Sequence, residues 1–191
     1  MKRKRVGVLI SGRGSNMMAL IEASHAADYP AEIVFVLSNT PDAGGIETAK
    51  KMGIASQIID HRKFASREEF DAAVNAALQS QKLDIIACAG FMRIMTPVLI
   101  SPWAGKMINI HPSLLPLYKG LHTHARALAD MQKEAGCTVH FVTATLDDGP
   151  IIAQSRVPIL PGDTPDILAA RVLIEEHKLY PEALRTVASR L

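Results

Sequence analysis

In Val6-Gly7-Val8-Leu9-Ile10-Ser11-Gly12-Arg13-Gly14-Ser15-Asn16, an apolar, β-branched run leads into a glycine-rich turn. The run has the length and composition of a buried strand. A segment with helical periodicity, residues 16–26, follows the turn. A strand that continues through a glycine turn into a helix favours an α/β fold.

The same alternation continues along the first half of the chain. Strands are predicted for residues 5–10, 32–37, 56–59 and 84–88, and helices for residues 16–26, 45–52 and 67–80. Ser66, with Glu69 three positions later, forms a capping box at the start of the helix 67–80. Alternating strands and helices with right-handed crossovers predict a doubly wound, mostly parallel, Rossmann-like sheet.

The second half has a different order of elements. A strand at 106–110 precedes a Pro-, Leu- and Gly-rich loop and a predicted helix at 123–133. The β-rich segments 138–143 and 151–158, joined by the turn 146–150, predict an antiparallel addition to the sheet. Thr164-Pro165 predicts the start of a last helix that runs to about Leu179, where Pro181 is expected to end it.

Length and composition limit the possible classes of protein. The chain has 191 residues, 48% of them hydrophobic, and we expect a single domain over residues 1–191. A net charge of +2, with basic residues scattered apart from Lys2–Arg5, argues against a nucleic-acid partner. The first apolar run is too short for a signal peptide or a membrane span, so we expect a cytoplasmic protein. Cys88 and Cys137 are expected to be buried, reduced thiols.

The turn Ser11–Asn16 is a candidate phosphate site, because glycine-turn amides at a helix start favour an anion. Met17 stands where a dinucleotide fingerprint has its third glycine, and the second strand ends in Ser38-Asn39 without the ribose-binding acid. A substrate with one phosphate therefore fits better than NAD or ATP. An ordinary capped glycine turn is the alternative.

Asn109 and His111 are the strongest catalytic candidates. Their spacing in a strand places both side chains on one face, and Pro112 keeps His111 extended. Both lie at the carboxyl end of a strand, where α/β sheets bind ligands, and Asn109 offers an N–H to a developing oxyanion. A hydrogen-bonded structural pair is the alternative interpretation.

Asp147, in a polar turn, would favour a protonated His111 if the two were close, although Asp-Asp-Gly-Pro is also a good turn sequence. His122 and His124 have no acidic or cysteine partner at a usual metal-ligand spacing, so we assign them loop and helix-start roles and expect no metal site. Glu175-Glu176-His177 is most simply a solvated patch, with a ligand contact as the alternative.

Four ordered motifs, residues 11–16, 90–94, 109–116 and 146–150, together resemble the folate-dependent phosphoribosylglycinamide formyltransferases over essentially the whole chain. The resemblance implies transfer of the formyl group of 10-formyltetrahydrofolate to the amine of glycinamide ribonucleotide in purine synthesis. It implies a tetrahedral intermediate whose oxyanion is held by Asn109 and protonated His111, with Asp147 assisting. The N-terminal half would bind the ribonucleotide, and the C-terminal half would bind folate and carry the catalytic groups.

The resemblance also implies the ligand contacts. Gly14, Ser15 and Asn16 would hold the substrate phosphate, and Glu176 would contact its glycinamide or ribose end. The pterin pocket would be lined by Met92, Arg93, Ile94, Met95, Asn109, Thr143, Ala144 and Asp147, with Arg67 near the glutamate tail. Three positions depart from the family pattern. Ala144 stands where an acidic residue is common, Asp148 where glycine is common, and Leu173 where a polar or basic residue is common.

Related activities give the alternatives. A 10-formyltetrahydrofolate hydrolase would normally carry a regulatory domain, and a methionyl-tRNA formyltransferase an RNA-binding domain, so neither is expected at 191 residues. A non-catalytic folate- or nucleotide-binding module is the alternative from another class. The expected partners are two small-molecule substrates without nucleic acid or membrane, and both a monomer and a homodimer are compatible with the sequence.

Overall fold

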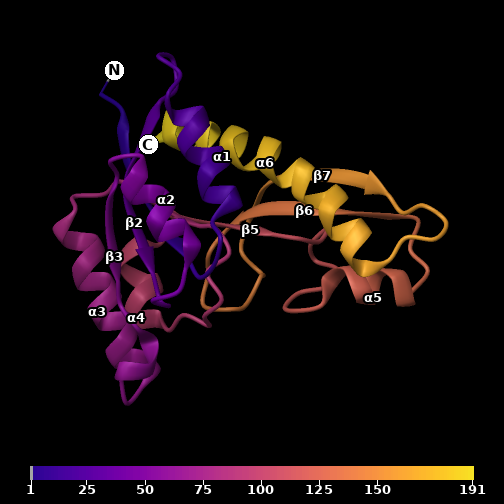
Figure 1. Ribbon diagram of the computed structural model, residues 1–191, viewed down its shortest axis with the longest axis horizontal. Coiled ribbons are helices and arrows are strands. Elements are labelled where there is room, and N and C mark those ends of the chain that lie inside the picture. Colours follow the sequence, from indigo (N-terminus) through magenta and orange to yellow (C-terminus); the bar gives the residue numbers. More distant parts are fainter. Residues whose placement is uncertain (1) are drawn as a thin grey trace.

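The computed structural model describes residues 2–191 and places a twisted sheet between helices (Figure 1). The strands are β1 (Lys4–Ile10), β2 (Ala31–Ser38), β3 (Ala55–Ile58), β4 (Ile85–Cys88), β5 (Met107–His111), β6 (Glu134–Phe141) and β7 (Ile151–Pro158). The helices are α1 (Ser15–Ser24), α2 (Gly44–Lys51), α3 (Arg67–Ser80), α4 (Pro97–Ile100), α5 (Thr123–Ala129) and α6 (Pro165–Arg190). Short 3₁₀ turns occupy His61–Lys63 and Ser101–Trp103.

The strands form one sheet of seven strands in the order β3-β2-β1-β4-β5-β6-β7. The strands from β1 to β5 pair in parallel, and β6 and β7 are added antiparallel. The order reverses between β1 and β4, so the loops that follow these two strands diverge from a common point. The predicted doubly wound sheet with an antiparallel addition is confirmed.

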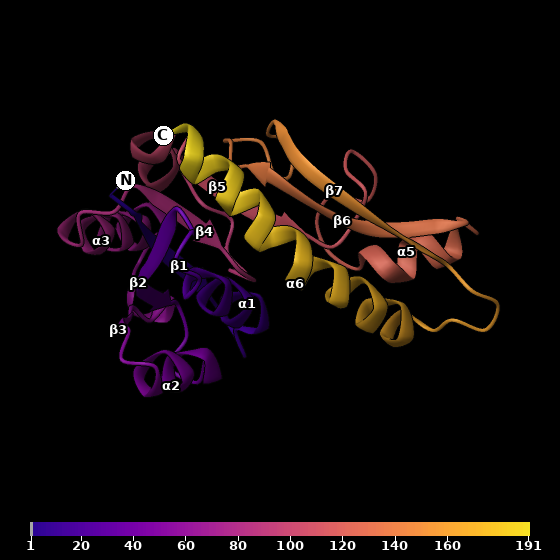
Figure 2. The ribbon, with the colours of Figure 1, turned by 90° about the horizontal axis from the view of Figure 1, so that it is seen from above.

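Two apolar cores cover the two faces of the sheet, because neighbouring strand residues point to opposite sides. Val6, Val8 and Ile10 of β1 belong to the core that contains side chains of α1, α2 and α6. Leu9 of β1 belongs to the other core, together with residues of α3 and α4. Seen from above, the long α6 lies along the sheet from β7 toward the strands of the first half (Figure 2). The free thiols of Cys88 and Cys137 are buried, and burial raises the pKa of each to about 12.

Helix α6 does not end before Pro181, and that prediction was wrong. Thr164 caps its start as expected, accepting a hydrogen bond from the Ile167 amide at 3.3 Å, but the helix continues to Arg190. An interior proline costs a helix about 3 kcal/mol. Apolar residues at helical spacing on both sides of Pro181 bury against the sheet and offset this cost; they are Leu179, Tyr180, Ala183, Leu184, Val187 and Ala188. No helix within residues 2–191 has both the length and the apolar character needed to cross a membrane.

The helix expected at 123–133 is also shorter than predicted. Helix α5 ends at Ala129, Met131 takes a positive φ of 50°, and β6 begins at Glu134. Residues from Glu134 to Cys137 pair with β7, so the strand expected at 138–143 begins earlier, at Glu134, and ends at Phe141. The Ser66 cap is confirmed by its 3.1 Å hydrogen bond from the Glu69 amide.

Candidate functional site

The loops at the carboxyl ends of β1, β2 and β4 are tied together at the point where the strand order reverses. The Ser11 amide donates to the Gly90 carbonyl at 3.1 Å, and the Ser11 hydroxyl accepts a 2.8 Å hydrogen bond from the Met92 amide. The same hydroxyl donates to Asn39 Oδ1 at 2.5 Å. Open α/β sheets bind their ligands at such a reversal.

The glycine-rich loop leaves the start of α1 free for an anion. Gly14 precedes the helix with φ 76° and no side chain caps the helix. The first amides of α1 therefore lack a capping partner, as an anion site requires. Ser15 is exposed and Asn16 is buried. The geometry fits the phosphate contact expected of these residues.

Asn16 and Glu176 meet although 160 positions separate them in the chain, since α6 lies against α1. Asn16 Nδ2 donates to Glu176 Oε2 at 2.6 Å, and both residues are buried. Burial raises the pKa of the Glu176 carboxyl, and the Asn16 hydrogen bond opposes that rise. Asn16 Oδ1 is buried without a hydrogen-bond partner, so it can accept from a ligand hydroxyl or amine. Glu176 therefore faces the candidate ribonucleotide site and is not a solvated surface group.

Asn109, His111 and Asp147 lie together as expected, and His140 completes the cluster. His111 Nδ1 is 3.4 Å from Asp147 Oδ2, and His140 Nε2 is 3.7 Å from Asp147 Oδ1. Asn109 Nδ2 is 3.2 Å from His140 Nε2. The two imidazoles and the carboxylate are almost completely buried, with at most 8% of each side chain exposed. We call these four residues the polar cluster.

His140 fixes the orientation of the Asn109 amide. Its Nδ1 is 2.9 Å from the Phe141 carbonyl, so a neutral ring with the proton on Nδ1 donates there and accepts from Asn109 at Nε2. Burial lowers the pKa of His140, which favours this neutral form. One N–H of Asn109 is thereby used, and the other remains for a ligand oxygen.

His111 has acceptors at both ring nitrogens. Nε2 is 2.9 Å from the Tyr118 carbonyl, while Nδ1 faces the Asp147 carboxylate. A ring that carries a proton on each nitrogen would donate to the backbone at Nε2 and form an ion pair with Asp147 at Nδ1.

A pocket of about 560 Å³, including its open mouth, lies beside the polar cluster. It is lined by Cys88, Phe91, Arg93, Ile94, Met95, Ile100, Asn109, His140, Val142, Thr143, Ala144, Thr145, Leu146 and Asp147. Most of the residues expected to bind folate are among them. Met92, exposed at 63%, and Arg67, at the exposed start of α3, are not part of this lining.

Gly149 closes the turn that carries Asp147. A Cβ atom at Gly149 would lie 1.7 Å from the Phe141 carbonyl oxygen, so only glycine permits this approach of the loop to β6. Asp147 itself has φ 49°, a left-handed conformation that Asp and Asn tolerate better than other side chains. The backbone therefore turns the carboxylate of Asp147 toward the two histidines.

Sequence reasoning missed His140. Residues 138–143 were expected to form a strand, but its register was not assigned, and only the antiparallel pair Asn109 with His140 brings this ring to the cluster. His122 precedes α5 with φ 57°, and His124 lies in its first turn, in agreement with the expected loop and helix-start roles. Within residues 2–191, no group of three or more His, Cys, Asp or Glu side chains is placed to hold a metal ion.

The chain is similar to known proteins over nearly its whole length. A model of the formyl transferase family matches residues 4–184. The phosphoribosylglycinamide formyltransferase of Escherichia coli (strain K12) is 45% identical over 174 residues, 91% of this chain and 82% of that protein. The trifunctional purine biosynthetic protein adenosine-3 of Chironomus tentans is 49% identical over 98% of this chain, which spans only 14% of that relative's length. The crystal structure of phosphoribosylglycinamide formyltransferase from Brucella melitensis superimposes with a TM-score of 0.94 at 55% identity, covering 98% of this chain and 96% of that one. The chain belongs to the formyl transferase family.

Proposed function

We propose that this chain transfers the formyl group of 10-formyltetrahydrofolate to the amine of glycinamide ribonucleotide. The observation that carries the proposal is the position of the polar cluster. Three of its residues, Asn109, His140 and Asp147, line the 560 Å³ pocket, and the free helix start at Gly14 follows β1, which is separated from β5 by β4 alone. One small molecule with a phosphate and one with a flat ring system can approach the cluster from these two places.

The lining of the pocket fits the formyl donor. Phe91, Ile100 and Val142 offer apolar surface to a flat ring, and Ile94 and Leu146 are exposed at 59% and 51% along the lining. Large apolar side chains that line an open pocket are typical of a small-molecule site. When bound, 10-formyltetrahydrofolate would supply a formyl carbon that an amine can attack. No metal is required for this reaction, because the charge that develops on the formyl oxygen meets N–H donors.

The chemistry follows from the donors and acceptors of the polar cluster. The amine nitrogen bonds to the formyl carbon, the bond from that carbon to the folate nitrogen breaks, and one proton passes from the amine to the folate nitrogen. The free N–H of Asn109 donates to the formyl oxygen as it gains negative charge, and the positive charge of a protonated His111 stabilises the same oxygen. Asp147 keeps His111 charged and accepts the amine proton through a water molecule. His140 positions the Asn109 amide.

The ribonucleotide would be held at the other end of the site. The free amides of the first turn of α1 suit its phosphate, and the glycinamide or ribose end would contact Glu176 and the unpartnered Oδ1 of Asn16. Leu173 offers no polar contact to the phosphate, which is left to the glycine-rich turn and other groups. The cytoplasmic location and the single-domain organisation remain predictions of the sequence.

A formyl-transfer assay with the purified full chain, 10-formyltetrahydrofolate and glycinamide ribonucleotide tests the proposal. Tetrahydrofolate and formylated product are followed separately, and we expect them to appear in equal amounts. His111→Ala and Asn109→Ala should each lower turnover by about 100-fold to 1,000-fold, the usual loss when one oxyanion donor is removed. Tetrahydrofolate without formylated product would instead indicate the hydrolase, and no reaction in either channel a binding module.

A further inference from the structure

Two backbone groups of residues 117–121, which we call the 117–121 loop, hold the polar cluster. The Tyr118 carbonyl accepts from His111 Nε2 at 2.9 Å, and the Gly120 amide donates to Asp147 Oδ2 at 2.9 Å. The first contact orients the imidazole, and the second orients the carboxylate that faces it. The position of this loop therefore sets the geometry between His111 and Asp147.

The loop has an unfavourable backbone conformation. Tyr118 has φ 56° and Gly120 φ 77°, and His122, just beyond the loop, has φ 57°. A left-handed conformation costs a residue other than glycine roughly 1–2 kcal/mol. Such conformations persist only where surrounding contacts hold them. Something must hold the 117–121 loop in place.

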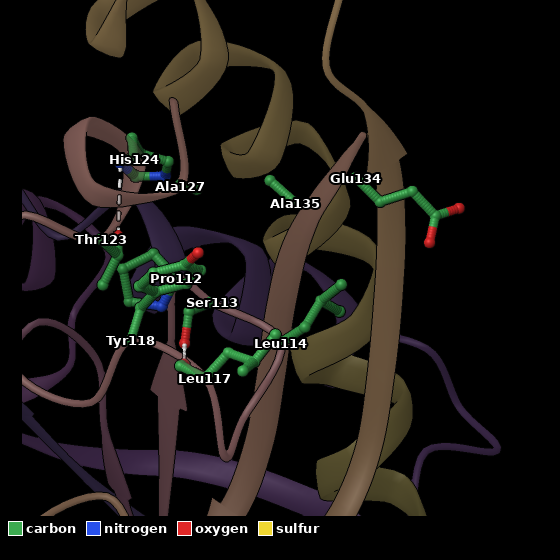
Figure 3. Close-up of a pocket in the computed structure, with 10 residues that line it drawn as sticks. All are labelled: Pro112, Ser113, Leu114, Leu117, Tyr118, Thr123, His124, Ala127, Glu134 and Ala135. Atoms are coloured by element: carbon green, nitrogen blue, oxygen red, sulfur yellow. Dashed lines mark hydrogen bonds between the residues drawn. The ribbon is translucent and has the colours of Figure 1, made fainter. Parts of the chain in front are cut away.

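Close packing is incomplete on one side of the loop. A small, partly open pocket there, with room for about one water molecule, is lined by residues that include Leu117, Tyr118 and His124 (Figure 3). A cavity leaves its lining without van der Waals partners on one side. Figure 3 also shows one polar contact that anchors the start of the loop, the 2.6 Å hydrogen bond from the Ser113 hydroxyl to the Leu117 carbonyl.

Three side-chain contacts hold the rest of the loop: the Tyr118 hydroxyl donates to Asp130, Lys119 pairs with Asp148, and Arg126 of α5 contacts the backbone on both sides of Gly120. Arg126 Nη1 donates to the Lys119 carbonyl at 2.7 Å and to the Leu121 carbonyl at 3.3 Å, on either side of Gly120. Its Cζ atom lies 5.2 Å from the centroid of the Tyr118 ring, within range of a cation–π contact. The side chain is exposed, and no hydrogen bond joins it to the polar cluster in the described structure, residues 2–191.

We propose that Arg126 is a positioning residue for formyl transfer, which holds His111 and Asp147 in their working geometry through the 117–121 loop. The inference rests on the proposed function. Arg126 fixes the two carbonyls that flank Gly120, and the backbone then presents the Tyr118 carbonyl and the Gly120 amide to the catalytic side chains. Misplacement of reacting groups by about 1 Å can lower a rate 100-fold, so a distant tether can affect turnover strongly.

The test compares Arg126→Ala and Arg126→Lys with Arg185→Ala in the full chain. Arg185 is a matched control: it also lies on a helix, with its Cζ atom 4.9 Å from the centroid of the Tyr29 ring, and it pairs with Asp28, so neither partner belongs to the 117–121 loop or to the polar cluster. We expect Arg126→Ala to lower kcat about tenfold or more while KM for both substrates stays within about twofold. Arg126→Lys keeps a charged hydrogen-bond donor and should restore part of kcat. Arg185→Ala should have the kcat and KM of the wild type.

Two further measurements separate positioning from general stability. Thermal unfolding should give similar midpoints for Arg126→Ala and Arg185→Ala, since both side chains make their contacts at the surface, Arg126 being exposed and Arg185 half-buried. In ¹⁵N-edited NMR spectra, the Nε2 proton of His111 should exchange faster with water in Arg126→Ala. If Arg126→Ala has the same kcat as Arg185→Ala, or if it changes only KM, the inference is overturned while the formyl transfer of the wild type stands. An inactive wild-type chain would instead remove the proposed function.

Discussion

Replacing Asp147 with asparagine tests the electrostatic core of the proposed mechanism. Asparagine has nearly the same size, tolerates the φ of 49°, and can still accept the 2.9 Å hydrogen bond from the Gly120 amide. Asp147→Asn therefore removes one charge and little else. The carboxylate lies 3.4 Å from His111 Nδ1. At an effective dielectric constant of about 20, two unit charges at that distance attract by about 5 kcal/mol.

If all of that attraction acted in the transition state, its loss would lower kcat by roughly 4,000-fold, since each 1.36 kcal/mol is a factor of ten. The usual contribution of a general acid or base sets a lower limit of about 100-fold. We therefore expect kcat to fall by between about 100-fold and 4,000-fold in the formyl-transfer assay.

Asp148→Asn provides the neighbouring control. Asp148 is half exposed and pairs with Lys119 at the surface, where ion pairs contribute at most about 1 kcal/mol, so its kcat should change less than fivefold. An Asp147→Asn enzyme that retains more than a tenth of wild-type kcat would refute the role assigned to the carboxylate. Equal losses in both variants would show that the loop, and not the charge facing His111, determines the rate.

His140→Phe removes the partner of the Asn109 amide. Steady-state kinetics should show kcat lowered about tenfold with little change in the KM for either substrate. An unchanged kcat would contradict the positioning role of His140. Burial raises the pKa of Glu176, so above its ordinary pKa the folded state binds more protons than the unfolded state and loses stability as the pH rises. Glu176→Gln should therefore raise the thermal unfolding midpoint more at pH 8 than at pH 5, which calorimetry at the two pH values checks. It should also weaken ribonucleotide binding at least about tenfold, as measured by titration. A lower unfolding midpoint of the variant at pH 8 would refute the expected direction of the pH effect. Tyr180→Phe removes a buried hydroxyl that donates to the Cys88 carbonyl at 2.8 Å. Urea unfolding should show the free energy of unfolding lowered by about 1 kcal/mol. An unchanged free energy of unfolding would mean that the Cys88 carbonyl does not need the Tyr180 hydroxyl as its hydrogen-bond donor.

The order of strands and helices was readable from the sequence because it depends on local patterns. The strand from 5 to 10, the glycine turn and the capped helix from 67 to 80 each carry their signal within a few neighbouring residues. The same local character explains the errors. Pro181 was expected to end the last helix, and the burial of Tyr180 and Leu184 against the sheet decided otherwise.

The contacts of the candidate site also fall into two groups, those that followed from local sequence and those that only the tertiary structure decided. Asn109 and His111 share one strand, so their common face followed from the two-residue period, and the glycine-rich turn predicted a candidate anion site within its own residues. The tertiary structure alone decided three contacts: Asn109 with His140, Asn16 with Glu176, and Arg126 with the 117–121 loop. The first depends on strand register and the other two on how helices pack. Local sequence determines which backbone a segment adopts, whereas contacts between segments depend on burial and pairing across the whole chain, which no local pattern encodes.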